Sequence, residues 1–427
     1  MDIQVARFRE VLGLLKPVIL RKTTLPVLTN VLLKGGQAVA TDLETMVIVQ
    51  VPEADIDCLL PYADVVKVLQ YVQGLEYLHF ETKKGKVAMS WSDGSATFDT
   101  GDVKDYPEVP EFVPVAEAPI DVDILIPAMH EVLGFAAIED TRPVLHGVTL
   151  IMGEPIAVAA GDGHRMAYKT LSQTFPQESI MVVPSSSVTT LKLLWEKTPR
   201  TPQVSDSLIS AIMANKQASV ALDNEKGLRF VFGDSTTAIV KLVQGDPPVW
   251  LKLIPKEDPV LEASLMAPLL ELAVRRVLSV AMEGSDIVRL VFNDDTAIIS
   301  AKHDGHEVES KVKVLSSQGA PNRVGLDARY LLDYLKGKDS IVTLSWVNLG
   351  SPVAFKHPNS PTVLIMPMNV DWGDAVPEPV AEQAEAEAGD SSPPTAEVPE
   401  DDSSPAPPEE AAKSPARRGK KKPHQQG

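Results

Sequence analysis

Five residues in the sequence carry side chains that could bind a metal ion or transfer a proton. They are Asp162, His164, His303, Asp304 and His306. Imidazole and carboxylate groups are common zinc ligands and general acids or bases, and only two residues separate His303 from His306. One hypothesis is therefore a metal-dependent hydrolase. The sequence has no P-loop, GxSxG, GxGxxG or CxxC arrangement, so nucleotide-driven chemistry is not expected of this chain.

The acidic turns also have a structural interpretation. Asp42, Asp162 and Asp304 lie in the segments ATDLE, AGDGHRMA and AKHDGHEVES. Runs of alternating apolar and polar residues flank each turn, which is typical of half-buried antiparallel strands. Because the turn with Asp42 lacks histidine, we interpret the motif as a recurrent structural turn and keep metal-dependent hydrolysis as an alternative.

Each turn belongs to a unit that occurs three times. Every copy begins with an amphipathic helix, passes through the acidic turn to a second helix, and closes with paired strands. The first helices lie in IQVARFREVLGLLKPVI, IDVDILIPAMHEVLGFAAI and LEASLMAPLLELAVRRVLSV, and the second helices in PYADVVKVLQYV, PSSSVTTLKLLW and LDARYLLDYLKG. We expect an α+β fold of tandem repeats at residues 1–119, 120–258 and 259–371, each with two helices and two small antiparallel sheets.

Residues 372–427 differ in composition from the rest. This tail holds ten of the 35 prolines and almost no large apolar residue. It cannot bury enough surface to offset its ordering entropy, so we expect it to be disordered. Its acidic stretch and basic end carry a net charge of -6, which leaves -12 of the total of -18 on residues 1–371.

Other features of the composition indicate a soluble, cytoplasmic protein without membrane partners. No run approaches the roughly 18 uninterrupted apolar residues of a membrane-spanning helix, and the N-terminal residues do not read as a signal peptide. The single cysteine, Cys58, excludes an intramolecular disulfide framework and fits a reducing compartment. We expect Cys58 to be a small buried residue.

Six segments, in this order, resemble a known family. They are KTTLPVLTNVLL (22–33), ATDLE (40–44), KDYPEVPE (104–111), TRPVLHGV (141–148), AGDGHRMA (160–167) and LIMPMNV (364–370). Residues 1–370 resemble the bacterial sliding clamp, the beta subunit of the replicative DNA polymerase. The resemblance implies the DNA clamp fold and a head-to-tail homodimeric ring with helices lining the hole. It also implies a processivity factor without catalytic site or cofactor, which encircles double-stranded DNA and binds the replicative polymerase and the clamp loader.

A protein that slides along DNA should contact phosphates through long cationic side chains, because base contacts would specify sequence. The candidates lie on or beside the predicted helices: Arg7, Arg9, Lys16, Arg21, Lys22, Lys67, Lys192, Lys197, Arg200, Arg275, Arg276, Arg329, Lys336 and Lys338. Lys22 lies where the family has a basic residue that touches DNA. The alternative for each residue is an ordinary solvated helix face. The first helix of the second repeat has no Lys or Arg, which departs from a basic lining on every helix.

The resemblance further implies a pocket between the second and third repeats that binds short motifs of partner proteins. Its residues here are Leu145, Gly163, His164, Arg165, Met166, Pro248, Leu253, Leu364, Met366, Pro367 and Met368. Flexible methionines suit a pocket that accommodates different partners. Gly161, Met166 and Asn369 stand where the family usually has a hydroxyl residue, leucine and arginine, so we expect a different partner preference.

Two further expectations come from the same resemblance. The subunit contacts correspond to Ala96, Phe98, Val277 and Leu278. The tail begins beside the pocket, which suggests the hypothesis that it modulates partner access. A scaffold of three peptide-binding units without DNA remains an alternative, and in it the cations would be incidental. If the cations instead line a hole while acids cover the outside, the negative net charge is compatible with a clamp.

Overall fold

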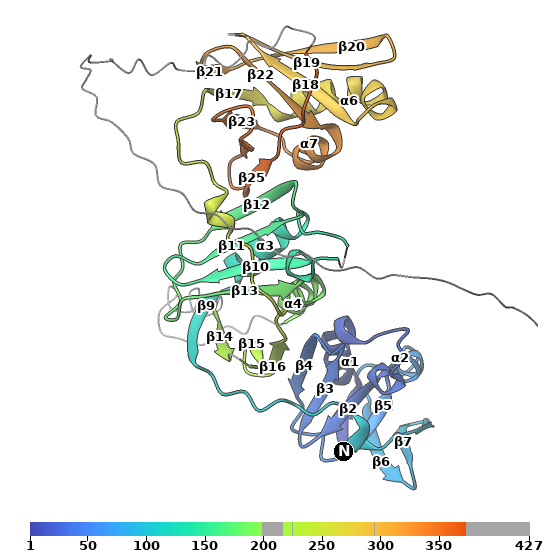
Figure 1. The fold of residues 1–427 in the computed structure, drawn as a ribbon. Coiled ribbons are helices and arrows are strands. Elements are labelled where there is room, and N and C mark those ends of the chain that lie inside the picture. Colours follow the sequence, from blue (N-terminus) through green and yellow to red (C-terminus); the bar gives the residue numbers. More distant parts are fainter. Residues whose placement is uncertain (140, 199–216, 224, 294, 373–427) are drawn as a thin grey trace, which may run out of the picture. The chain divides into compact units, whose positions relative to one another are not determined.

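Three groups of elements with the same order follow one another along the chain (Figure 1). The computed structural model describes residues 1–139, 141–198, 217–223, 225–293 and 295–372, and residues 1–371 form one compact unit. We refer to residues 1–119, 120–258 and 259–371 as repeats 1, 2 and 3. Residues 373–427, for which the sequence predicted disorder, lie outside the described residues.

Each repeat has a first helix, a run of strands, a second helix and a closing group of strands. Repeat 1 contains β1 (Asp2–Gln4), α1 (Val5–Leu15), β2 (Asn30–Lys34), β3 (Gln37–Thr41), β4 (Thr45–Gln50), β5 (Cys58–Pro61), α2 (Tyr62–Leu69), β6 (Tyr77–Lys83), β7 (Lys86–Trp91) and β8 (Gly94–Asp99). Repeat 2 contains β9 (Ala116–Asp121), α3 (Val122–Leu133), β10 (Gly147–Met152), β11 (Ala157–Gly161), β12 (Arg165–Thr170), β13 (Ser179–Pro184), α4 (Ser185–Lys197), β14 (Gln217–Asp223), β15 (Gly227–Phe232) and β16 (Thr236–Val240). Repeat 3 contains β17 (Leu261–Met266), α6 (Ala267–Glu283), β18 (Ile287–Phe292), β19 (Thr296–His303), β20 (His306–Lys313), β21 (Ser316–Gly319), β22 (Asn322–Asp327), α7 (Ala328–Leu335), β23 (Ile341–Trp346), β24 (Val353–Lys356) and β25 (Thr362–Ile365).

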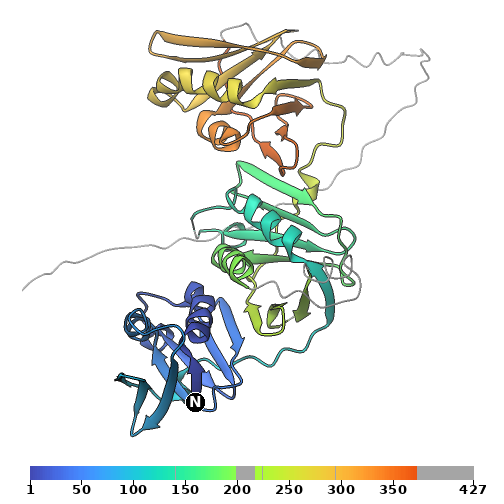
Figure 2. The same cartoon turned by 180° about the vertical axis from the view of Figure 1, so that it is seen from behind.

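The helices form because their apolar residues recur at helical spacing, and α3 and α7 also begin with a capping carboxylate. In α1 the buried stripe includes Val5, Phe8 and Leu12. The Asp121 side chain accepts a hydrogen bond from the second residue of α3, and Asp327 does the same at the start of α7. The two helices of each repeat lie side by side (Figures 1 and 2) and bury their stripes in one apolar core with the sheets.

Two of the four antiparallel sheets cross from one repeat to the next. The sheet of order β5-β2-β3-β4-β16-β15-β14-β9 joins repeats 1 and 2, and the sheet of order β13-β10-β11-β12-β25-β24-β23-β17-β21 joins repeats 2 and 3. The remaining sheets, β1-β6-β7-β8 and β20-β19-β18-β22, each stay within one repeat. Strands β8 and β20 are therefore edge strands, with one side unpaired among the described residues.

Each shared sheet carries a small apolar cluster on the face opposite the main core. Val47 of β4 belongs to the main core while its neighbour Met46 packs with Tyr106 and Ile239 in the junction between repeats 1 and 2. The junction between repeats 2 and 3 has the equivalent cluster around Met166 and Trp250. Successive side chains of a strand point to opposite faces of the sheet, so both faces of these strands are buried.

Cys58 is a free, buried cysteine as expected, with 1% of its surface exposed. Burial raises the pKa of its thiol to about 12, which makes it unreactive. Within the described ranges, no helix has both the length and the apolar character needed to cross a bilayer.

Candidate functional site

The acidic turns are stabilised by their own carboxylates. Asp162 Oδ1 accepts hydrogen bonds from the backbone N–H groups of His164 and Arg165 at 2.9 and 3.0 Å. Asp42 Oδ1 accepts the equivalent pair, from Glu44 and Thr45, at 3.0 and 2.7 Å. The structural interpretation of the turn therefore holds in repeats 1 and 2, where the aspartate closes the turn between two strands.

The metal-ligand candidates do not come together. Asp162 and His164 lie in the β11–β12 turn of repeat 2, whereas the other three candidates lie in the β19–β20 turn of repeat 3. Among the described residues, no three His, Cys, Asp or Glu side chains are grouped as a metal ion would need. The geometry of these residues therefore gives no support to the metal-dependent hydrolase.

An apolar cavity of about 260 Å³ lies where repeats 2 and 3 meet. It is lined by Gly163, His164, Arg165, Met166, Trp250, Leu253, Pro352, Leu364 and Met366. Seven of these are residues that the sequence suggested. Trp250 and Pro352 were missed, although an aromatic residue in the proline-flanked linker PPVWLKLIP was a usable signal.

Four other predicted pocket residues are not among those that line the cavity: Leu145, Pro248, Pro367 and Met368. Leu145 is only 7% exposed and packs in the cluster that contains Trp250. The backbone N–H of Met368 donates to the Gly325 carbonyl at 2.9 Å, which attaches this segment to β22.

The cavity exists because β12 and β25 pair across the repeat boundary. Met166 lies opposite Leu364 in this pairing, and the Met366 N–H donates to the His164 carbonyl at 2.9 Å. The wall from repeat 2 and the wall from repeat 3 are thus parts of one sheet. A ligand in the cavity would contact both repeats.

Arg165 fastens the two repeats together beside the cavity. Its guanidinium lies 3.1 Å from Asp162 and 2.7 Å from Asp333 of α7, and only 11% of its side chain is exposed. It also lies over the rings of Tyr330 and Phe135, with 4.7 and 5.1 Å from Cζ to the centroids. Asp162 and Asp333 balance the charge of Arg165 within the junction, and the rest of the cavity lining is mainly apolar.

Comparison with known proteins agrees with this arrangement. Residues 252–369 match the family of the DNA polymerase III beta subunit, C-terminal domain. The beta sliding clamp of Streptomyces coelicolor is 27% identical over 263 residues, which cover 60% of this chain and 65% of that protein. The beta sliding clamp homolog GriR of Streptomyces muensis is 23% identical over 313 residues, covering 72% and 75%. The crystal structure of the DNA polymerase III subunit beta from Pseudomonas aeruginosa has a TM-score of 0.74 at 22% identity and covers 87% of this chain and 100% of that one.

The chain is thus similar to beta sliding clamps, its residues 252–369 match the C-terminal domain of the DNA polymerase III beta subunit, and its fold is that of the solved clamp structures. The expected resemblance and the expected DNA clamp fold are therefore confirmed. In this family, the side chains of interest beyond the pocket are the cations that could contact DNA and the edges that could contact another subunit.

Four of the predicted DNA-contacting cations are free. Lys16, Arg21, Lys22 and Lys336 are exposed, and in the described part of the chain their side chains have no hydrogen bond or ion pair. The first three follow α1 closely in the sequence. Free, long cations can approach phosphates without first breaking a contact, as a sliding clamp requires. Arg200 lies outside the described residues.

Other predicted cations form local contacts on the surface. The ion pairs are Arg7–Glu10 at 3.6 Å, Lys67–Asp64 at 3.0 Å, Arg275–Glu271 at 2.7 Å and Lys192–Glu196 at 3.9 Å, and Arg276 donates to Ser310 Oγ at 3.3 Å. Exposed pairs of this kind contribute about 0–1 kcal/mol each. They can be exchanged for phosphate contacts at little cost.

Arg9, Arg329 and Lys338 have stronger roles within the chain. The Arg9 guanidinium donates to the backbone carbonyls of Leu69 and Val72 at the end of α2, which gives it a structural role, and its DNA contact stays a prediction. Hydrogen bonding to Asp327 raises the pKa of Arg329. Lys338 lies 4.5 Å from the centroid of the Tyr334 ring, and burial lowers its pKa.

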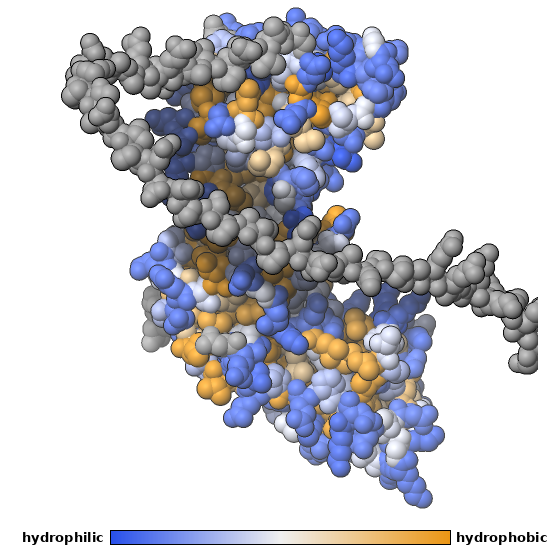
Figure 3. Space-filling view, in the orientation of Figure 1, coloured by the Kyte–Doolittle hydropathy of each residue, from blue (hydrophilic) through white to orange (hydrophobic). Residues whose placement is uncertain are grey.

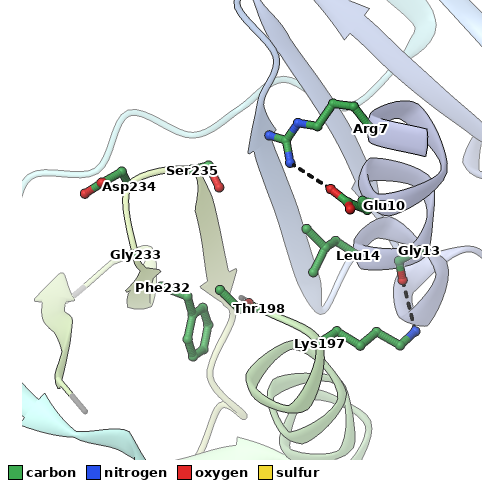
Figure 4. A pocket seen from close by; sticks show the side chains of 10 residues that line it. All are labelled: Arg7, Glu10, Gly13, Leu14, Lys197, Thr198, Phe232, Gly233, Asp234 and Ser235. Atoms are coloured by element: carbon green, nitrogen blue, oxygen red, sulfur yellow. Dashed lines mark hydrogen bonds and ion pairs between the residues drawn. The ribbon is translucent and has the colours of Figure 1, made fainter. Parts of the chain in front are cut away.

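A second cavity, of about 450 Å³, lies at the junction of repeats 1 and 2 (Figure 4). Residues from α1 form one wall, and the end of α4 with the β15–β16 turn forms the other. Lys197 Nζ donates to the Gly13 carbonyl at 3.0 Å, which ties α4 to the last turn of α1. Burial, followed by the nearby Lys16, lowers the pKa of Lys197. Lys197 thus joins two repeats in addition to any contact with DNA.

The predicted subunit contacts divide into accessible and inaccessible residues. Ala96 and Phe98 lie on the edge strand β8 and are partly exposed. Leu278 of α6 is also partly buried, but Val277 is fully buried in the core of repeat 3. Val277 therefore has no surface for a partner subunit, and its role in this chain is packing.

Proposed function

We propose that this protein is a sliding clamp that encircles double-stranded DNA and tethers the replicative polymerase for processive synthesis. The observation that carries the proposal is the continuity of the sheets across the repeats, which leaves a different open edge in repeat 1 and in repeat 3. Because the two edges differ, the edge of one chain can pair with the other edge of a second chain, head to tail. The assembly becomes a ring when the rotation between chains closes. Clamps of this family are processivity factors, so no catalytic step is assigned to the chain.

The internal junctions define how the open edges would pair. Val47 of β4 lies opposite Ala238 of β16, and Ala167 of β12 lies opposite Val363 of β25. In both junctions, the strand after the acidic turn pairs with the last strand of the following repeat. In a ring, the strand after the acidic turn of repeat 3 is β20, and the last strand of the partner's repeat 1 is β8.

The register follows from equivalent positions. Val308 of β20 lies opposite Ala301, just as Val47 and Ala167 lie opposite Ala40 and Ala160. Ala96 of β8 lies opposite Met89, just as Ala238 and Val363 lie opposite Phe230 and Phe355. We therefore propose a homodimer in which Val308 faces the partner subunit's Ala96, and His306 faces the partner subunit's Phe98.

The contact with DNA is assigned to the free cations, first among them Lys22 with Arg21 and Lys16. They act on phosphates, so binding is independent of sequence and weakens with salt. The decisive experiment measures retention of the protein on closed circular DNA and on the same DNA linearised, at moderate salt. Retention only on the circle supports encirclement, whereas equal retention on both overturns it and favours the scaffold alternative.

The cavity at the junction of repeats 2 and 3 is proposed to bind short apolar motifs of the polymerase, the clamp loader and other partners. Its walls contain Met166, Leu364 and Met366, and the flexible methionine side chains can adjust to different anchors. Partners with one such motif would compete for it. The cytoplasm, where bacterial DNA is replicated, is the compartment in which a clamp acts.

A further inference from the structure

Helices α1 and α6 are the first helices of repeats 1 and 3, and they bury equivalent residues. Counted from the first residue of each helix, Phe8 and Leu12 of α1 are buried, and so are Leu270 and Val274 of α6. The two helices can therefore be compared position by position. A difference between the sides that do not face the core then reflects what each helix meets at the boundary of its repeat.

The side of α1 that meets repeat 2 is polar. Arg7 and Glu10 line the cavity opposite Lys197 and Thr198 at the end of α4 (Figure 4), and they form an ion pair with each other at 3.6 Å. Burial lowers the pKa of Lys197, and the nearby charge of Lys16 lowers it further. Within the chain, the first helix of one repeat thus meets the end of the next repeat's second helix through polar groups.

The positions of Arg7, Glu10 and Lys16 are all leucine in α6. They are Leu269, Leu272 and Leu278, of which Leu269 and Leu272 are 51% and 45% exposed. Three residues apart, these two are neighbours on the helix surface. Figure 3 shows apolar residues at the surface of repeat 3 among hydrophilic ones. Polar contacts like those of α1 are therefore not available to this side of α6.

The arrangement of the repeats indicates which segment covers this side of α6. In the proposed ring, the repeat that follows repeat 3 is repeat 1 of the second chain, whose second helix is α2. Tyr71 and Leu75 come just after the end of α2 and are 88% and 84% exposed. Arg9 binds the carbonyls of Leu69 and Val72 there, which fixes the backbone from which these two side chains project.

We propose that Leu269 and Leu272 pack against the partner subunit's Tyr71 and Leu75, so that the helix layer is apolar between subunits and polar within the chain. This inference rests on the proposed homodimer and adds a helix contact to the pairing of β20 with β8. It also assigns a specificity role to the two leucines. They match an apolar helix end and mismatch the polar end of α4, which favours joining repeat 3 to repeat 1 of a second copy.

A double variant gives α6 the polar pair of α1. Leu269→Arg/Leu272→Glu should weaken association about 100-fold, from about 10-fold at each of the two interfaces of a closed dimer. Both residues are exposed in the single chain, so its melting temperature as a monomer should stay the same. Leu349→Glu, which changes another exposed leucine, 63% exposed after β23, is the control and should associate normally. Sedimentation of the full chains measures this, and normal association of the double variant overturns the inference.

Cross-linking separates this inference from the proposed homodimer. A chain with Leu75→Cys and Leu272→Cys should form covalent dimers with a bifunctional maleimide, and each single variant should not, because native Cys58 is buried. Ala96→Cys with Val308→Cys reports on the strand pairing in the same way. Links in the strand pair but none in the helix pair overturn the inference while the homodimer stands. If neither pair links, the homodimer itself fails, and the inference falls with it.

Discussion

The junction between repeats 1 and 2 and the junction between repeats 2 and 3 share a backbone plan but differ in chemistry. Both pair the strand after an acidic turn with the last strand of the next repeat. Both bury one aromatic residue of the linker with its polar atom satisfied, Tyr106 Oη by the Asn30 carbonyl at 3.3 Å and Trp250 Nε1 by Thr149 Oγ1 at 2.8 Å. The strand pairing and the buried linker aromatic are thus common to both junctions.

The differences lie in the side chains around the acidic turns. The first junction has a cavity of about 320 Å³ whose rim includes Glu44, Glu108, Glu225, Lys226 and Lys241. At the second junction the lining is mainly apolar, with His164 and Arg165 as its polar side chains apart from the Trp250 indole. Different side chains on the same backbone plan therefore make one cavity mainly apolar and the other charged.

The turn itself differs in the same way. Gly163 has a φ of 100° and lines the second cavity without a side chain, whereas Leu43 has a φ of 78° and is 49% exposed. A bulky residue in the left-handed region is strained, by about 1–3 kcal/mol. Gly163 therefore adds no side chain to the cavity at the second junction, whereas the Leu43 side chain lines the cavity at the first.

The polar side-chain interactions that connect the repeats also differ between the two junctions. The residue after the turn is Thr45 in repeat 1, whose hydroxyl donates to Ser187 Oγ at 2.7 Å in a buried site. In repeat 2 it is Arg165, which contacts Asp162 and Asp333. A neutral hydrogen bond in one junction thus corresponds to an ion-pair network in the other.

The largest expected effect concerns the proposed junction between subunits, which would follow the same plan. Ala96→Asp should make the protein monomeric at concentrations where the native chain is a dimer, with association weakened at least about 100-fold, because a charge would enter the apolar face of the paired strands. Analytical ultracentrifugation measures this. Ser95→Asp, on the other face of β8, is the matched control and should stay dimeric; dissociation of both variants alike would contradict the register.

Arg165→Ala should destabilise the chain more than Thr45→Ala. The first leaves Asp162 without its cation in a site that is mostly buried, and after allowance for the exposed Asp333 we expect a loss of roughly 2–3 kcal/mol. The second removes one neutral hydrogen bond and should cost about 1–2 kcal/mol. Urea unfolding compares the two variants. Equal losses would show that the ion-pair network adds nothing beyond a hydrogen bond.

Met366 and Lys241 occupy equivalent positions after the last strand of their repeats, and they allow a matched test of the two cavities. Met366→Glu should weaken binding of apolar peptides by about 10-fold or more, because a carboxylate would line the apolar wall. Lys241→Glu should leave that binding unchanged. Fluorescence polarisation with peptides selected on the native chain gives both values, and a similar loss in the two variants would place the binding site elsewhere.

The smallest expected effect concerns the cations. Lys22→Ala should weaken binding to circular DNA a few-fold and reduce the salt dependence by about one phosphate contact. Arg329→Ala is the control, because this guanidinium already pairs with Asp327 and Asp286. A titration of binding against salt separates them. If Arg329→Ala weakened DNA binding more than Lys22→Ala, the DNA contact would lie nearer α7 than Lys22.

The sequence predicted elements whose cause is local. The helices of all three repeats, the acidic turns and buried Cys58 follow from apolar spacing, turn chemistry and composition. It did not show that Val277 is fully covered, that Arg9 binds the end of α2 or that Trp250 enters the cavity. Each of these depends on contacts between segments that only the folded chain brings together. The short strand β21, whose residues are all exposed, had no periodic signal at all.

The shared sheets also constrain the order in which the chain can fold during synthesis. Strand β4 ends at Gln50, but its neighbour β16 begins only at Thr236. Until the ribosome has delivered β16, the nascent chain exposes a complete strand edge of repeat 1, and the same holds for β12 until β25 emerges. Such edges invite pairing with other nascent chains. The architecture that lets one repeat continue into the next thus leaves a strand edge of repeats 1 and 2 unpaired until the following repeat has been synthesised.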